Sequence, residues 1–145
     1  PCPVWARPAH EFKLVLGPQD RYFAPETIAT LLNRPFRVTP AQDRMGLRLD
    51  GPRLMPQAAL AIPSEPLLRG AVQVAGDGVA TVLMADHQTT GGYPKIATLV
   101  DCETDRLAQL RPGDTVLFQA VTPEQAIAMV RQRARALAGC LARPA

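Results

Sequence analysis

The chain has 145 residues, of which 47% are hydrophobic, and it carries a formal net charge of +3. This length and apolar content suit one folded domain with its own core and exclude global disorder. Fifteen prolines and ten glycines indicate many turns and short elements, which favours a β-rich fold over a helical bundle. The weak positive charge lacks the basic stripe with interleaved aromatic residues that is typical of nucleic-acid proteins, so we expect no nucleic-acid binding.

The three cysteines, Cys2, Cys102 and Cys140, stand alone in the sequence. Isolated cysteines in odd number predict neither a zinc site nor a disulfide framework, and a reducing cytoplasm is the expected location. No apolar run is long enough for a membrane span, no signal peptide is recognisable, and the two histidines have no metal-ligand spacing. Because the chain begins with proline and not methionine, we expect that a preceding segment has been removed.

The first half of the chain predicts one strand, one helix and further short strands. Residues 10–17 alternate apolar and polar side chains, as in a half-buried strand. Residues 25–33 predict a helix, because Pro25 stands at a favoured first position and Pro35 follows its end. Further short strands are expected at 36–39 and 47–49, and proline-broken loop or edge structure at 53–63.

The second half predicts more strands and the clearest helix. Strands are expected at 71–74, 79–84, 96–100 and 115–121, with a tight hairpin turn at 75–78 and a helical turn at 105–110. Thr122, Pro123 and Gln125 form the capping box that starts the last helix. A buried stripe is expected on that helix at Ala126, Ile127, Val130, Ala134 and Leu137, and the cluster Arg131, Arg133 and Arg135 is expected to be a solvated face. The fold is predicted to be mainly β: a closed or nearly closed barrel with a C-terminal helix and one or two short helices.

A dense polar cluster, "ADHQTTGGYP" at residues 85–94, follows a predicted apolar strand. Gly91 and Gly92 would permit positive φ and close approach of a ligand, so that exposed N–H groups form an anion-binding nest. Around them stand an acid, an amide, two hydroxyls and an aromatic ring: Asp86, Gln88, Thr89, Thr90 and Tyr93. A surface turn that carries polar side chains and binds nothing explains the spacing equally well. His87 by itself is more typical of a surface or core histidine than of a catalytic base.

Two more clusters are candidates for a site. Asp43 and Arg44 lie in a loop, where a guanidinium suits carboxylate or phosphate recognition, although a surface ion pair is the simpler interpretation. Ser64 and Glu65 lie between two prolines that would hold the carboxylate in place, although a solvated acidic loop is again simpler.

Taken together, several stretches in this order resemble one known family. They are "GPQDRYF", "RVTPAQDRMGLRLDG", "PSE", "GAVQV", "ADHQTTGGYPKIATLV" and "LAQLRPGDTVLF", spread over residues 10–121. The set resembles allophanate hydrolase subunit 2, the biotin-dependent carboxyltransferase subdomain A/B family, which includes KipA-like proteins and the C subunit of 5-oxoprolinase. Two positions depart from the family pattern: Pro66 stands where glycine is usual and removes an N–H, and the 75–78 hairpin lacks a Pro-Pro pair.

The resemblance implies a single cyclophilin-like domain over residues 1–145, forming the C-terminal half of a longer chain. It also implies a partner, a sister subunit similar to allophanate hydrolase subunit 1 (KipI-like), and ATP-dependent opening of a lactam such as 5-oxoproline. ATP would act in the whole assembly, and biotin would come from a partner in a urea-carboxylase-like alternative. A further alternative is a non-catalytic KipA-type regulatory module, whereas peptidyl-prolyl isomerase activity would rest on the fold alone.

On this resemblance we assign roles to the clustered residues. Asp86, Gln88 and Glu65 are the expected catalytic residues that handle N–H protons, and no metal site is expected. The expected substrate-binding residues are Arg44, Ser64, Gln73, Thr89, Thr90, Gly91, Gly92 and Tyr93. In this hypothesis the glycine amides and threonine hydroxyls hold a carbonyl or phosphate oxygen, Arg44 neutralises a carboxylate or phosphate, and Tyr93 packs on the substrate ring.

Overall fold

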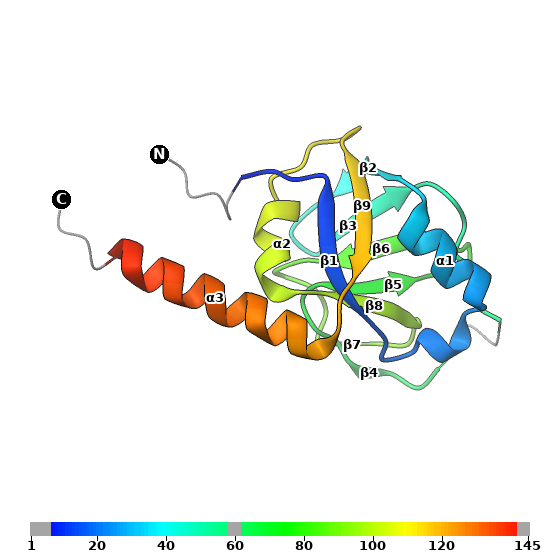
Figure 1. The fold of residues 1–145 in the computed structure, drawn as a ribbon. Coiled ribbons are helices and arrows are strands. Elements are labelled where there is room, and N and C mark those ends of the chain that lie inside the picture. Colours follow the sequence, from blue (N-terminus) through cyan, green and yellow to red (C-terminus); the bar gives the residue numbers. More distant parts are fainter. Residues whose placement is uncertain (1–6, 58–61, 142–145) are drawn as a thin grey trace.

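The computed structural model describes residues 7–57 and 62–141. Seven strands close into a barrel in the order β1-β8-β5-β6-β3-β2-β9 (Figure 1). Their bounds are β1 Glu11–Leu16, β2 Phe36–Gln42, β3 Gly46–Asp50, β5 Ala71–Val74, β6 Ala80–Leu83, β8 Lys95–Leu99 and β9 Thr115–Ala120. The barrel closes through the parallel pair β1–β9, whereas its other neighbouring strands run antiparallel.

Alternation along the strands sends one row of side chains into the barrel. Phe12 and Leu14 of β1 and Leu47 and Leu49 of β3 are buried in the core, and their chain neighbours face outward. On β5 the inward residue Val72 belongs to the same core, whereas Ala71 joins a separate small cluster outside it. The outer face of β5 is therefore also covered.

The cover on that outer face is a second, two-stranded sheet. It consists of β4, Glu65–Pro66, and β7, Thr90–Gly91, paired antiparallel with Glu65 opposite Gly91. We predicted neither strand, because two residues are too few to show a periodic pattern. The described part of the predicted 53–63 loop contains no named strand, and residues 58–61 lie outside the described structure.

Three α-helices and one short 3-10 helix, η2 (Asp20–Tyr22), accompany the barrel in the described ranges. Helix α1, Pro25–Asn33, has the predicted bounds and buries Leu31. Helix α2, Asp101–Leu107, starts four residues earlier than the predicted turn at 105–110. The molecule is thus a closed barrel with a substantial helical part, mixed α/β in class and not simply mainly β.

The third helix, α3, spans Pro123–Leu141 and starts with the predicted capping box. Thr122 N donates to Gln125 Oε1 at 2.9 Å, and Gln125 N donates to Thr122 Oγ1 at 3.2 Å. The predicted buried stripe is wrong, because α3 has no buried residue and extends away from the barrel (Figure 1). Periodicity identified an apolar face but could not show whether anything covers it.

Candidate functional site

The loop that follows β6 is tied to the β2–β3 hairpin, so two sequence motifs meet at one end of the barrel. Met84 N donates to Met45 O at 3.0 Å, and Asp86 N donates to Arg44 O at 2.7 Å. Asp43 Oδ1 accepts hydrogen bonds from Met45 N and Gly46 N at 2.8 and 3.0 Å. Asp43 therefore shapes its own loop, and Arg44 pairs with a different acid.

That acid is Asp86, which binds the Arg44 guanidinium through both carboxylate oxygens. Arg44 Nε and one terminal nitrogen donate to Asp86 at 2.6 and 2.9 Å. The two side chains are 77% and 52% exposed, respectively. The hydrogen bond from Arg44 lowers the pKa of Asp86. With both oxygens engaged and a lowered pKa, Asp86 is a poor proton acceptor in this arrangement, and its main action is to orient Arg44.

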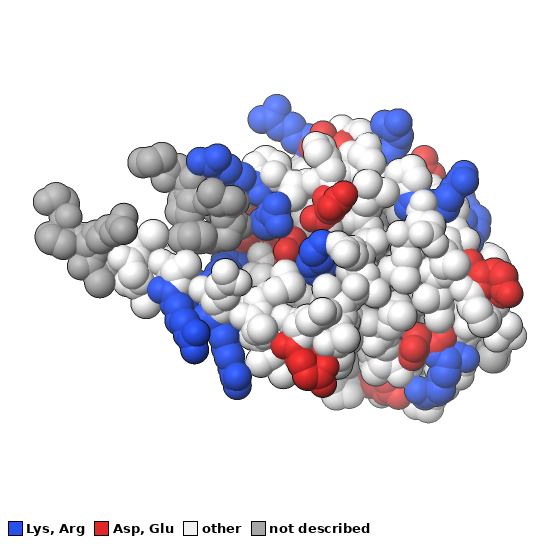
Figure 2. Space-filling view, in the orientation of Figure 1, with Lys and Arg blue, Asp and Glu red and all other residues white. Residues whose placement is uncertain are grey.

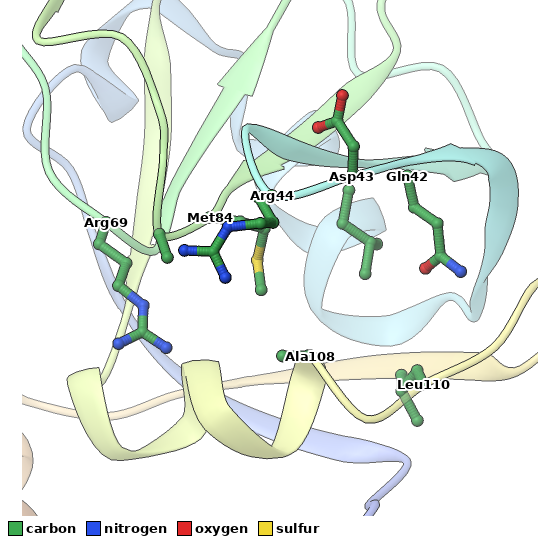
Figure 3. A pocket seen from close by; sticks show the side chains of 9 residues that line it. Gln42, Asp43, Arg44, Arg69, Met84, Ala108 and Leu110 are labelled. Atoms are coloured by element: carbon green, nitrogen blue, oxygen red, sulfur yellow. The ribbon is translucent and has the colours of Figure 1, made fainter.

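A cavity of about 390 Å³ opens beside Arg44 at this end of the barrel (Figure 3). In Figure 3, Arg44, Met84 and Arg69 extend toward α2, and the Asp43 carboxylate points away. The cavity is lined by Gln42, Asp43, Arg44, Leu47, Arg69, Met84, Ala85, Ala108 and Leu110. We call it the mouth cavity.

Arg69 is a cavity residue that sequence reasoning missed. It donates to Asp105 at 2.7 Å, and Asp105 also accepts a hydrogen bond from Arg133 of α3. Burial alone would raise the pKa of Asp105, but the hydrogen bonds from the two arginines outweigh it and lower that pKa. The Nε of Arg69 is buried and has no hydrogen-bond partner among the described residues. The only available signal was its place between the "PSE" motif, which ends four residues earlier at Glu65, and Gly70.

The backbone of the glycine pair does not have the positive φ that we expected. Neither Gly91 nor Gly92 has positive φ. Gly91 lies in β7 opposite Glu65, and Gly92 O accepts a hydrogen bond from Ile62 N at 3.3 Å. A Cβ on Gly92 would lie 2.8 Å from Ile62 O, closer than real contacts allow. Gly92 thus permits close approach of the protein's own backbone at Ile62, whereas anion binding by the glycine pair stays a prediction.

A second cavity, of about 570 Å³, lies on the outer face of β3, β5 and β6, and we call it the outer groove. Three predicted residues line it: Gln73, Gln88 and Tyr93. Gln73 is only 6% exposed, and its Nε2 has no hydrogen-bond partner among the described residues. The Nε2 atoms of Gln73 and Gln88 both lie against Gly91, at 3.1 and 3.4 Å from the point a Cβ would occupy there.

Glu65 belongs to a buried polar network next to the outer groove. Its Oε2 accepts from Gln19 Nε2 at 2.6 Å and from Lys95 Nζ at 3.3 Å. Lys95 is 3% exposed, and its backbone N donates to Gln19 Oε1 at 2.9 Å. We missed Gln19 and Lys95, although a lysine at the start of an apolar strand was an available signal. The geometry gives Glu65 a clear task, the neutralisation of a buried ammonium group.

The structure does not gather the predicted residues in one cavity. Arg44 lines the mouth cavity, whereas Gln73, Gln88 and Tyr93 line the outer groove, and the two cavities share Gln42 and Asp43. Ser64, Thr89 and Thr90 are exposed and line neither cavity. Among the residues described, no three His, Cys, Asp or Glu side chains are placed to hold a metal ion. No helix in the same ranges is long and apolar enough to cross a membrane.

Comparison with known proteins now decides the family. Residues 2–120 match the family described as "Carboxyltransferase domain, subdomain A and B". The chain belongs to this carboxyltransferase-domain family. It is 44% identical over 90 residues to the C subunit of 5-oxoprolinase from Haemophilus influenzae, and 35% identical over 111 residues to the protein of the same name from Escherichia coli. These matches cover 62% and 77% of this chain.

The carboxyltransferase-domain chain spans about a third of the length of these curated relatives, 29% and 36% respectively. Among solved structures, TTHA0988 is 36% identical with a TM-score of 0.68, over 82% of this chain and 23% of that one. The Kluyveromyces lactis urea carboxylase has a TM-score of 0.81 over 86% of this chain and 12% of that one. At 22% identity, that likeness shows a shared fold only.

Proposed function

We propose that this chain is part of the C subunit of an ATP-dependent 5-oxoprolinase, the enzyme class that opens a lactam by hydrolysing its C–N bond. The similarity to two curated proteins of that name supports the reaction class. In this proposal residues 1–145 form one cyclophilin-like domain in the C-terminal half of a longer chain. The chain acts in the cytoplasm with a KipI-like sister subunit, and ATP is bound in the assembly outside this domain.

The observation that carries the site is the unpaired Gln73 amide in the outer groove. A buried donor without a partner costs about 1–3 kcal/mol, and a rotation of the Gln73 amide toward a ligand oxygen in the outer groove would recover that free energy. Gln88 supplies a second amide beside it, and the exposed ring of Tyr93 can pack on a flat lactam. The outer groove thus suits a small molecule whose carbonyl or carboxylate oxygen accepts hydrogen bonds and whose ring is apolar.

The remaining predicted residues take supporting roles in this proposal. Glu65 holds Lys95 next to the groove, and Asp86 holds Arg44 at the mouth cavity. Arg44 would contact a charged group only if that group reaches the hairpin residues Gln42 and Asp43, which both cavities share. The primary site is therefore the outer groove, and Arg44 lines the separate mouth cavity.

The test is ATP-dependent turnover of 5-oxoproline by the assembled enzyme with substitutions in this chain. Gln73→Leu removes the amide at nearly constant volume, and we expect KM to rise about tenfold or more, because one buried hydrogen bond to substrate is lost. Gln109→Leu makes the same change at an exposed position outside both cavity walls and should leave KM unchanged. Arg44→Ala should raise KM less than Gln73→Leu does.

The opposite order of the two KM effects would contradict the assignment of the substrate to the outer groove. A large loss with Arg44→Ala and none with Gln73→Leu would place the substrate in the mouth cavity. A tight complex with the sister subunit and no turnover under any condition would support the non-catalytic regulatory module instead. The carboxyltransferase alternative predicts that avidin, which captures biotin, abolishes activity, whereas the lactam hydrolase is insensitive to it.

A further inference from the structure

Helix α3 carries an apolar stripe that the described structure leaves unburied. Ile127, Val130, Ala134, Leu137 and Leu141 follow one another at intervals of three and four residues, the a and d positions of a coiled-coil seam. None of them is buried, and Ile127 and Leu141 are 51% and 79% exposed. The family match ends at residue 120, so this helix lies outside the part of the chain that the family description matches.

The stripe continues onto the barrel through an apolar groove. A cavity of about 420 Å³ lies between the first turns of α3 and the neighbouring strands β1 and β8. Its walls are largely aliphatic: Val15, Leu99, Val100, Ala126, Ile127 and Val130 are among them. A helix lying along α3 would thus bury the seam and fill this groove at the same time.

Burial is also what such a helix needs for its stability. Helices in proteins owe most of their stability to packing of an apolar face, and isolated helices are marginal in water. Beyond its capping box, α3 is tied to the rest of the described fold by the side-chain hydrogen bonds of Arg133, which donates to Cys102 O at 3.0 Å and to Asp105. Arg133 flanks the seam between Val130 and Leu137, but the seam residues themselves stay unburied, so a partner would add the missing packing.

Charge indicates which partner fits. From Gln125 to Leu141 the helix has three arginines and no aspartate or glutamate. Figure 2 shows basic side chains projecting from the part of the molecule that α3 forms. Arg131 and Arg135 are exposed and form no ion pair within the described ranges, and a second copy of α3 would bring no carboxylate to them over this stretch. We propose that α3 is a docking helix for an acidic amphipathic helix of a partner protein, which packs on the Ile127–Leu141 seam and pairs a carboxylate with Arg131, the exposed arginine at the e position that flanks the seam.

The probe for this proposal is a designed heptad peptide with Leu at its a and d positions and Glu at e and g, labelled for fluorescence anisotropy. Its control carries Lys in place of Glu. The full chain should bind the acidic peptide and not the basic one, and added salt should weaken binding. Leu137→Ala should weaken binding about tenfold, because a buried leucine side chain is lost from the seam. Gln132→Ala, on the face away from the seam, should bind as the parent does.

Two measurements separate a docking defect from a folding defect and from self-association. Circular dichroism should show the same helicity for Leu137→Ala and Gln132→Ala. Sedimentation of the chain without peptide should show a monomer. Equal binding of the two peptides, no binding of either, or a dimer that Leu137→Ala dissociates would each overturn the proposal, the last by making a second copy the occupant.

Discussion

The buried ammonium of Lys95 makes Glu65 the most informative position for a stability measurement. The two side chains are 3% and 45% exposed, and Nζ lies 3.3 Å from Oε2. Removing one partner of a fully buried pair costs about 3–5 kcal/mol, whereas exposed pairs contribute about 0–1 kcal/mol. Because water reaches one side of this pair, we expect Glu65→Ala to lower the free energy of unfolding by about 2 kcal/mol.

A double-mutant cycle for the Glu65–Lys95 pair also needs Lys95→Met and the double variant. Lys95→Met keeps the aliphatic stem and leaves a half-exposed carboxylate, so we expect a loss below about 1 kcal/mol. Glu65→Ala should then cost much less in the Lys95→Met background, which gives a coupling energy of about 1–2 kcal/mol. Urea unfolding with a constant m value is the assay. Additivity within about 0.5 kcal/mol would refute the reasoning and show that Lys95 is stabilised by other groups.

Other positions give simpler tests. Gly92→Ala should destabilise the fold by about 1–3 kcal/mol, since its Cβ would lie 2.8 Å from a backbone carbonyl oxygen. Gly139→Ala, which has open space around it in α3, should instead stabilise the protein by about 0.5–1 kcal/mol. Equal shifts of the melting temperature in the two variants would contradict this difference. Thr122→Ala should cost about 1 kcal/mol of helix stability, seen as fraying of α3 by circular dichroism. Arg44→Ala should raise the pKa of Asp86 toward its ordinary value in an NMR titration. Because the pKa of Asp86 is lowered in the folded protein, the Arg44–Asp86 pair stabilises the fold at neutral pH, and this stabilisation is lost as the pH falls through the folded-state pKa. An unchanged Asp86 titration in Arg44→Ala would refute the pairing.

Local features of the fold were predictable because each depends on neighbours in the sequence. Alternation placed the strands around Phe12 and Leu47, proline started α1, and the Thr122–Gln125 capping box started α3. Two-residue strands show no alternation of apolar and polar residues, so the β4–β7 sheet could not be predicted from the sequence. The same holds for Gly92: only the position of Ile62 O in the structure shows that backbone packing requires a glycine there.

The candidate site was predictable in residue type but not in arrangement. Sequence motifs singled out Gln73, Gln88 and Tyr93, which line the outer groove together, and Arg44, which lines a different cavity. Gln19, Lys95 and Arg69 were missed, because each gains its significance from a partner distant in sequence.

The sequence by itself determined where most barrel strands and the helices α1 and α3 begin, since hydrophobic period, a proline at the first helical position and a capping box act over a few residues. The tertiary structure alone decided that β1 and β9 close the barrel in parallel, that Arg44 meets Asp86, and that the apolar face of α3 stays uncovered. The physical reason is that pairing and burial depend on which distant segments the folded chain brings together, and a linear pattern does not contain that information.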